Sequence, residues 1–188
     1  YIIGSASTSI IITKIMKKKD VRSYGSGNAG ATNTFRIFGK KIGLIVLFTD
    51  IIKAFLSMFI VLNFFYDDRV LFGGIALIIG HIFPVFFGFK GGKGAAVGIG
   101  FFFAIHPAIP LIGFLVWFII FFSSRYVSIS TISMFISYPI SCFFILNGVS
   151  FFIFSILCTI IIILSHKSNI IRLINRKESK FMFKKSTV

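Results

Sequence analysis

Long apolar runs follow one another along almost the whole chain, and only short polar segments separate them. Of the 188 residues, 56% are hydrophobic, and the mean hydropathy is +0.97. A soluble domain of this length could not bury so many apolar side chains in one core. Helices, in contrast, satisfy their own backbone hydrogen bonds within lipid. The sequence therefore predicts an all-α fold, that of a polytopic integral membrane protein.

The apolar runs predict about seven transmembrane helices. The predicted spans are Tyr1–Met16, Ile42–Phe65, Val70–Phe87, Ala95–Ile105, Leu111–Phe122, Ile129–Leu146 and Phe151–Leu164. Short turns are expected at Tyr66–Arg69 and at Asn147-Gly148. We expect residues 1–188 to form a single transmembrane domain, because no stretch has the composition of a separate soluble domain.

Two parts of this division leave an alternative open. The first run is short for a spanning helix, which needs roughly 20 residues. Because the sequence does not begin with methionine, we expect a few residues of the first span to precede Tyr1. A secretory signal peptide is the alternative, but the basic residues follow the run instead of preceding it. His106-Pro107 separates the fourth and fifth spans, which could also form one kinked unit.

Basic residues gather in four of the polar segments. The chain has 20 Lys and Arg against 5 Asp and Glu, a formal charge of +15. The basic segments are Lys17–Lys41, Gly80–Gly94, Ser123–Ser130 and the tail from His166. The positive-inside rule places all four in the cytoplasm, with the N-terminus outside and the C-terminus inside. Because the charge lies at the membrane surface, we expect membrane lipid and anionic substrates as partners, and no nucleic acid.

The segment Gly25–Asn33, GSGNAGATN, has the composition of an anion-binding loop. Its glycines permit tight turns, and its small polar side chains supply hydrogen-bonding groups. Arg36 follows with a planar donor group suited to phosphate. The candidate binding residues are Ser26, Asn28, Asn33 and Arg36. A polar turn with a basic flank is the alternative, but such a turn does not require so many glycines and small polar residues.

The segment Gly80–Gly94, GHIFPVFFGFKGGKG, is a second candidate loop. Glycines let backbone N–H groups approach a phosphate, lysines add charge, and a following helix offers its positive N-terminal end. The candidate residues are His81, Lys90, Gly91, Gly92, Lys93 and Gly94. The full Walker A pattern is absent, so ATP is not the expected ligand. A flexible turn with two snorkelling lysines is the alternative, and His81 could simply bond a backbone carbonyl.

Other polar residues stand in or beside the apolar runs. Asp50 and Lys53 are three residues apart in the second span, which permits an ion pair on one helix face. His166 and Asn169 open the tail and share a helix face, where the histidine could accept a proton or bind phosphate. Glu178 is the only acid of the basic tail and could anchor it by an ion pair.

Several common catalytic patterns are absent from the sequence. The soluble-type acyltransferase signature would place Asp five residues after a histidine, where this chain has Phe86, Leu111 and Ile171. No Ser-His-Asp or Cys-His set is readable. No cluster of histidines and carboxylates indicates a metal, and we expect no cofactor. Cys142 and Cys158 are isolated within apolar runs and predict no disulfide framework.

Four blocks of the sequence carry a resemblance to a known family. They are GSGNAGATNTFR (Gly25–Arg36), GHIFPVFFGFKGGKGAA (Gly80–Ala96), SRYVSISTI (Ser124–Ile132) and HKSNIIRLINRKESKF (His166–Phe181). In sequence and spacing they resemble the bacterial membrane acyl-phosphate:glycerol-3-phosphate acyltransferases, the PlsY family. The likeness covers nearly the whole chain. Ala29, where the family often has proline, and Ser168 depart from the family pattern.

The resemblance implies transfer of a fatty acyl group from acyl phosphate to the 1-hydroxyl of sn-glycerol 3-phosphate. The products are lysophosphatidic acid and phosphate, in the first step of phospholipid biosynthesis. It also implies a multi-pass protein of the bacterial inner membrane, with its site facing the cytoplasm and with a soluble acyl-phosphate-forming enzyme as an expected partner. The implied catalytic positions are Ser26, Arg36, His166 and Asn169. The implied substrate-binding positions are Asn28, Asn33, His81, Lys90, Gly91, Gly92, Lys93, Gly94, Ser128 and Ser130, and Glu178 is a structural position.

Two function classes other than an enzyme remain open on hydropathy and charge alone. The first is a small transporter or channel for an organic phosphate, although the chain has no internal repeat and its motifs share one membrane face. The second is a structural membrane protein that recruits a partner through the basic tail. That function leaves the two glycine-rich loops unexplained.

Overall fold

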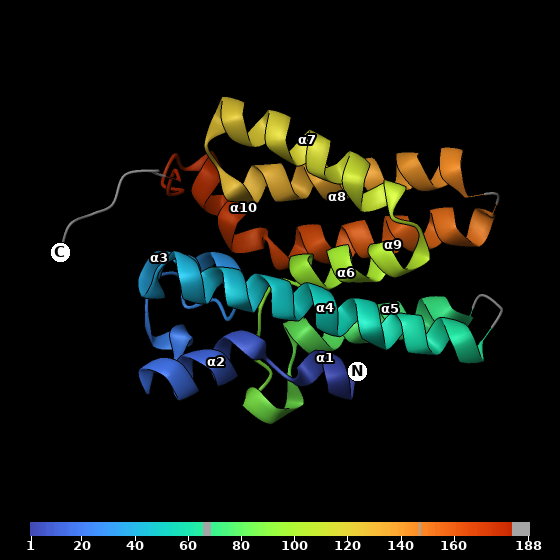
Figure 1. Ribbon diagram of the computed structural model, residues 1–188. Coiled ribbons are helices and arrows are strands. Elements are labelled where there is room, and N and C mark those ends of the chain that lie inside the picture. Colours follow the sequence, from blue (N-terminus) through green and yellow to red (C-terminus); the bar gives the residue numbers. More distant parts are fainter. Residues whose placement is uncertain (66–68, 147, 182–188) are drawn as a thin grey trace. The chain divides into compact units, whose positions relative to one another are not determined.

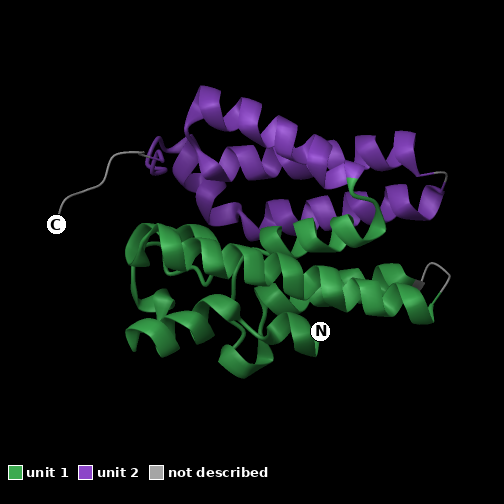
Figure 2. Ribbon diagram, in the orientation of Figure 1, with its two compact units in different colours: residues 1–107 green, residues 108–188 purple. Residues whose placement is uncertain are grey.

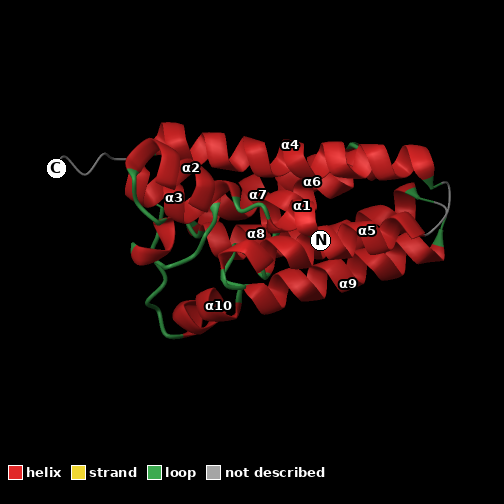
Figure 3. Ribbon diagram, turned by 90° about the horizontal axis from the view of Figure 1, so that it is seen from below, coloured by secondary structure: helices red, strands yellow, loops and turns green. Residues whose placement is uncertain are grey.

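The computed structural model describes residues 1–65, 69–146 and 148–181, and these residues contain helices and loops but no strand (Figures 1 and 3). The chain divides into two compact units, Tyr1–Pro107 and Ala108–Val188 (Figure 2). The turns predicted at Tyr66–Arg69 and Asn147-Gly148 lie partly outside the described residues, and the single-domain organisation stays a prediction.

Unit 1 is built around one long helix, α4, with shorter helices packed against it. α4 spans 25 residues, Lys40–Phe64. The other elements are α1 (Ile2–Ser5), α2 (Thr8–Lys17), η1 (Val21–Ser23), α3 (Ala31–Phe38), α5 (Arg69–Ile82), η2 (Val85–Phe87) and α6 (Ala95–Ile105). α4 packs most extensively against α6. A Cβ atom at Gly100 of α6 would collide with the Ile51 carbonyl of α4, so only glycine permits this close approach.

The first predicted span, Tyr1–Met16, is not one continuous helix. α1 and α2 are separated at Ala6-Ser7, where the backbone is extended. The interruption leaves the Ala6 carbonyl outside the helical ladder, where it accepts a hydrogen bond from Lys53 Nζ at 2.9 Å. The side chains around the interruption are polar and buried, which a lipid-facing helix would not require. They include Ser5, Ser7, Thr8, Ser9 and Thr13.

The third predicted span also ends earlier as an α-helix than the sequence suggested. α5 stops at Ile82, and a single 3₁₀ turn, η2, follows Pro84. Proline lacks a backbone N–H and disfavours helical geometry in the residue before it. The helix therefore ends before Phe83-Pro84, and the chain continues through η2 into Gly88–Gly94, the glycine-rich loop. The predicted break between the fourth and fifth spans is confirmed, since α6 ends at Ile105, before His106-Pro107.

Unit 2 consists of consecutive antiparallel neighbours. α7 (Ala108–Ser124) packs on α8 (Val127–Ile145), and α8 packs on α9 (Val149–Ser165). The hydroxyl of Thr159 on α9 donates to the Phe135 carbonyl of α8 at 2.8 Å. α9 meets the short α10 (Lys167–Ile174) at a bend of 60° next to His166. The bend separates the apolar helix from the basic tail.

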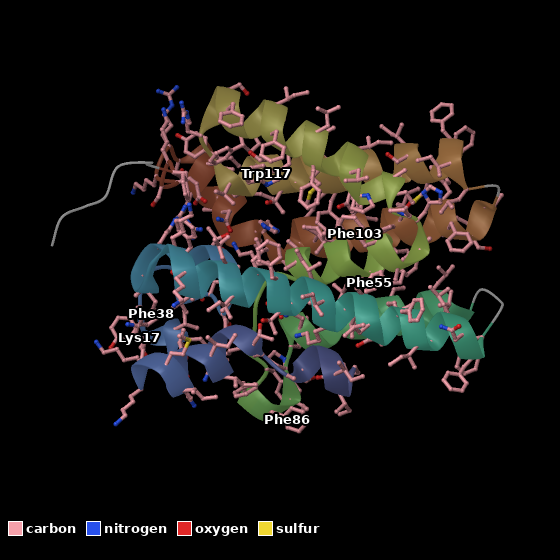
Figure 4. The ribbon with its side chains drawn as sticks, in the orientation of Figure 1. Lys17, Phe38, Phe55, Phe86, Phe103 and Trp117 are labelled. Atoms are coloured by element: carbon pink, nitrogen blue, oxygen red, sulfur yellow. The ribbon has the colours of Figure 1, made fainter. Side chains whose placement is uncertain are left out.

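Three segments among the described residues are long and apolar enough to cross a membrane. They are Lys40–Phe64, Val70–Phe87 and Val127–Ile145, and the bent pair α9–α10 would make a fourth. α6 and α7 are apolar but shorter. Large apolar side chains project from the helices of both units, as lipid contact requires (Figure 4). The chain is thus a multi-pass helical protein, while seven spans and the orientation of the termini remain predictions.

The close approach of α6 to α4 gives a first test. We expect Gly100→Ala to destabilise the protein by about 1–3 kcal/mol, because the new Cβ would overpack the contact with Ile51 and Ala54. Thermal unfolding in detergent measures the effect. Gly73→Ala is the control, because its Cβ would lie 3.7 Å from Val61 Cγ1, an ordinary contact. Equal stability of the two variants would contradict the predicted packing.

Candidate functional site

The side chain of Asn33, which is only 3% exposed, holds the loop Gly25–Gly30 in its conformation. Its Oδ1 accepts a hydrogen bond from the Ser26 amide at 3.0 Å. Its Nδ2 donates to the carbonyls of Val21, Tyr24 and Asn28 at 3.0–3.2 Å. The amide group of Asn33 is therefore used within the loop. Its scaffold role was not indicated by the sequence, which suggested contact with substrate.

The other candidate residues of this loop lie closer to the surface. Ser26 is exposed and Asn28 is half-buried. Arg36 is exposed on the last turn of α3, one turn beyond Asn33. A hydroxyl, an amide and a guanidinium on one short segment can bind the oxygen atoms of a phosphate.

Two backbone contacts and one arginine join this loop to the glycine-rich loop. The Ala29 amide donates to the Gly91 carbonyl at 3.2 Å. Arg22 Nη1 donates to the Phe87 carbonyl at 2.6 Å and to the Lys90 carbonyl at 3.3 Å. The first and second motifs are therefore joined directly within unit 1. The role of Arg22 could not be predicted from the sequence, because nothing in its neighbourhood distinguishes it from the other basic residues of the loop.

Arg22 is itself held by Asp20. Its Nη2 lies 2.8 Å from Asp20 Oδ2, and its Nε lies 3.1 Å from Oδ1. These hydrogen bonds hold the pKa of Asp20 below its usual range. The carboxylate fixes the planar guanidinium in the orientation that reaches the second loop.

The glycine-rich loop folds back along the end of α5. The Gly91 amide donates to the Ile82 carbonyl and the Gly92 amide to the His81 carbonyl, both at 3.1 Å. Gly94 has φ +80° and precedes α6, a conformation that favours glycine. The amides of Gly91 and Gly92 are therefore occupied, unlike the donors that the sequence analysis expected. The amides at the start of α6, together with Lys93 and Lys90, are the groups suited to an anion.

Buried polar groups lie behind the glycine-rich loop. His81 is 3% exposed, and its ring stands beside Gly92, where an added Cβ would collide with Nε2. The ion pair predicted for the second span is confirmed, with Lys53 Nζ 2.9 Å from Asp50 Oδ1. His81 thus supports the loop from its interior side, although a contact with substrate was expected.

The last two motifs meet in unit 2 at the carboxylate of Glu178. Its Oε1 accepts from Asn169 Nδ2 at 2.6 Å and from Ser128 Oγ at 3.0 Å. Its Oε2 accepts from Arg172 Nε at 2.7 Å, which confirms the ion pair expected for the tail. Burial would raise the pKa of Glu178, but the donated hydrogen bonds outweigh burial and lower it.

His166 and Ser130 lie near this cluster along the chain, and both are buried. His166 Nδ1 lies 2.8 Å from the Ile162 carbonyl, so Nδ1 carries a proton and donates it. In the neutral ring, Nε2 then has the lone pair. Ser130 Oγ donates to the Tyr126 carbonyl at 2.8 Å, within its own helix.

A separate open hollow of about 440 Å³ lies beside the first loop in unit 1. Its lining combines two lysines with aromatic and aliphatic side chains: Lys17, Lys19, Tyr24, Ile37 and Phe38. Lys17 and Phe38 are labelled in Figure 4. The predicted site residues do not line it.

The apolar helices identify the chain as a multi-pass membrane protein. Its two glycine-rich loops form a polar site that is suited to an anion. The model of the glycerol-3-phosphate acyltransferase family matches residues 1–176. The chain is 43% identical over 183 residues to the glycerol-3-phosphate acyltransferase of Aquifex aeolicus, which covers 96% of this chain and 95% of that protein. It is 38% identical to the Fusobacterium nucleatum protein of the same description, over 97% of this chain and 95% of that one. The chain belongs to the glycerol-3-phosphate acyltransferase family.

Solved structures agree with this assignment. The crystal structure of PlsY (YgiH), an integral membrane glycerol 3-phosphate acyltransferase, in its glycerol 3-phosphate form matches with a TM-score of 0.92. The identity is 41%, over 97% of this chain and 92% of that chain. The lysophosphatidic acid form of that protein matches with a TM-score of 0.90 at 40% identity, over 97% of this chain and 91% of that chain. The resemblance seen in the four sequence blocks is thereby confirmed.

The scaffold role of Asn33 gives a second test. We expect Asn33→Ala to destabilise the loop by about 1–3 kcal/mol, because three buried or partly buried carbonyls would lose their donor. Hydrogen-exchange mass spectrometry should then show faster amide exchange over residues 24–29. The adjacent, exposed Thr32 gives the control variant Thr32→Ala, which should leave exchange unchanged. Slow exchange in Asn33→Ala would contradict the scaffold role.

The lowered pKa of Glu178 gives a third test, on stability against pH. A carboxylate whose pKa is lower in the folded protein adds stability above its unfolded value, 4.5, and that stability is lost as the pH falls through the folded value. We therefore expect Glu178→Gln to lower the unfolding temperature at neutral pH. The difference from the unaltered protein should shrink in acid. A difference that is constant with pH would contradict the role of the ionised carboxylate.

Proposed function

We propose that this protein transfers a fatty acyl group from acyl phosphate to the 1-hydroxyl of sn-glycerol 3-phosphate. The products would be lysophosphatidic acid and phosphate, in the first step of phospholipid biosynthesis. Family membership and the glycerol 3-phosphate and lysophosphatidic acid forms of the PlsY crystal structures support the acceptor and the product. The acyl-phosphate donor rests on the resemblance and on the missing His-x4-Asp signature. The observation that carries the proposal is the joining of two glycine-rich loops by Arg22 and by the Ala29–Gly91 hydrogen bond.

The glycine-rich loop is assigned to the phosphate of glycerol 3-phosphate. Lys93 and Lys90 supply positive charge, and the first amides of α6 supply donors at the positive end of that helix. Gly91 and Gly92 contribute through the shape of the loop, since their amides donate to the Ile82 and His81 carbonyls of α5 and a side chain at either position would collide with His81.

The first loop is assigned to the acyl phosphate. Ser26, Asn28 and Arg36 offer a hydroxyl, an amide and a guanidinium for its phosphate group. Asn33 holds this loop in shape. Holding both substrates in a reactive orientation supplies much of the rate enhancement, because a bimolecular step becomes effectively unimolecular.

The chemical step is a direct acyl transfer. The 1-hydroxyl oxygen attacks the acyl carbon, a new C–O bond forms, and the bond from that carbon to the phosphate oxygen breaks. Phosphate leaves with the electron pair, so little acid catalysis is needed. The hydroxyl proton goes either to His166 Nε2 or to the departing phosphate. Asn169 is assigned to catalysis together with His166. Ser128 and Ser130 are assigned to substrate binding, and their hydroxyls donate to Glu178 and to the Tyr126 carbonyl, respectively.

The setting of the enzyme follows the charge pattern. We place it in the bacterial inner membrane with its N-terminus outside and its C-terminus and site in the cytoplasm. The basic loops then face the compartment in which phosphorylated substrates occur. A soluble enzyme that makes acyl phosphate would dock on this basic face.

Acylation of labelled glycerol 3-phosphate by membranes that contain the protein tests the proposal, with palmitoyl phosphate or palmitoyl-CoA as donor. We expect lysophosphatidate from palmitoyl phosphate only. Product from palmitoyl-CoA would contradict the donor assignment. No product from either donor, with a folded protein, would contradict the enzyme and favour a transporter of organic phosphate.

The lysine of the glycine-rich loop gives a sharper test of the binding assignment. A hydrogen bond to a charged group contributes roughly 1.5–3 kcal/mol. We therefore expect Lys93→Met to raise the KM for glycerol 3-phosphate roughly 10- to 100-fold, with the KM for acyl phosphate little changed. Lys40→Met, at the exposed start of α4, is the charge-matched control. Equal KM values in the two variants would contradict the assignment of Lys93.

A further inference from the structure

We propose that Asp50 is a positioning residue for the glycerol 3-phosphate site, and that it acts through His81 on the glycine-rich loop. This inference rests on the proposed function, because it names a residue that prepares the same site. Asp50 itself lies inside α4 and outside all four sequence motifs.

The carboxylate of Asp50 lies between two cationic or potentially cationic groups. Its side chain is 1% exposed, and Oδ1 lies 2.9 Å from Lys53 Nζ and 3.6 Å from His81 Nδ1. Lys53 also donates to the Ala6 carbonyl at the interruption between α1 and α2. Asp50 thus connects α4 with the end of α5, and Lys53 ties the pair to the N-terminal segment.

His81 passes this constraint to the glycine-rich loop in two ways. Its backbone carbonyl accepts the Gly92 amide at 3.1 Å. Its ring closes the space beside Gly92, because an added Cβ there would collide with Nε2 and would lie 2.8 Å from the Ala29 carbonyl. Gly92 is therefore confined between the imidazole of His81 and the first loop. A rotation of the imidazole would displace Gly92 and, with it, Lys93 and the start of α6.

A charged aspartate is a costly way to fill space inside an apolar helix. An ion pair that only packs could be replaced by apolar residues of similar volume without loss of stability. A carboxylate, however, can fix an imidazole by accepting its Nδ1 proton, as it does for metal ligands and catalytic histidines. The separation of 3.6 Å is slightly long for a direct hydrogen bond. His81 Nδ1 is buried and has no hydrogen-bond partner in the described structure, and the carboxylate of Asp50 is the group that faces it.

Direct binding of glycerol 3-phosphate to the full-length, detergent-purified protein tests this inference by calorimetry. We expect Asp50→Asn to weaken binding roughly 10- to 100-fold, the scale of a small misplacement of binding groups. His81→Phe should weaken it similarly. The double variant should bind no more weakly than either single one, because the two residues act in series. The KM for acyl phosphate should change little in all three.

Ser57→Ala is the matched control. Ser57 lies two turns further along α4, is buried, and bonds only the Lys53 carbonyl of its own helix in the described structure. It should lower stability slightly and leave binding unchanged. If Asp50→Asn misfolds through the unpaired ammonium, Asp50→Asn with Lys53→Met removes both charges together and should still bind weakly.

The outcomes separate this inference from the proposed function. Unchanged binding by a folded Asp50→Asn protein would overturn the positioning role alone. Additive losses in the double variant would also overturn it, since independent defects would then be acting. Absence of both binding and acylation in the unaltered protein would overturn the proposed function and this inference together. Binding without acylation would overturn only the catalytic proposal, and the positioning role would still be decided by the variants.

Discussion

The buried amide of Asn33 is the interaction on which the polar face of unit 1 depends. Glycine-rich backbone has little preference for any one conformation, and it loses much entropy when it is fixed. One side chain that contacts Val21, Tyr24, Ser26 and Asn28 offsets this cost by giving the loop a single set of hydrogen bonds. The Ala29 amide then donates to the Gly91 carbonyl, and this hydrogen bond helps to position the glycine-rich loop against the first loop.

Both units must hold polar groups in place beside lipid-facing helices, and each does so with a different kind of hydrogen bond. In unit 1 the solution is mainly backbone, with carbonyls of α5 accepting the amides of the glycine-rich loop. In unit 2 it is mainly side chain, with the carboxylate of Glu178 accepting hydrogen bonds from donors on α8 and α10. The first solution leaves an open surface suited to a ligand. The second holds its donors on a single carboxylate and therefore joins α8, α10 and the segment of Glu178.

Much of this organisation could be predicted from local patterns, and the failures have a common cause. Charge and hydropathy identified the helical membrane fold, and glycine content identified both loops. The Asp50–Lys53 pair followed from helical spacing. The interruption at Ala6-Ser7 could not be predicted from local sequence. The Ala6 carbonyl that it frees accepts a hydrogen bond from Lys53, which is distant in sequence. Likewise, the amides of Gly91 and Gly92 seemed available for a ligand until the end of α5 supplied their acceptors.

The position of Glu178 in the chain has a consequence for how the protein is made. The contacts that shape the two loops of unit 1 all lie within the first half of the chain, so they can form while later residues are still being synthesised. The cluster in unit 2 must wait, because Ser128, Asn169 and Arg172 gain their shared acceptor only when Glu178 has left the ribosome. The Phe181 amide, which donates to the Arg125 carbonyl at 2.8 Å, comes later still. The cluster of unit 2 therefore forms after the contacts of the two loops, once the segment that carries Glu178 has been synthesised.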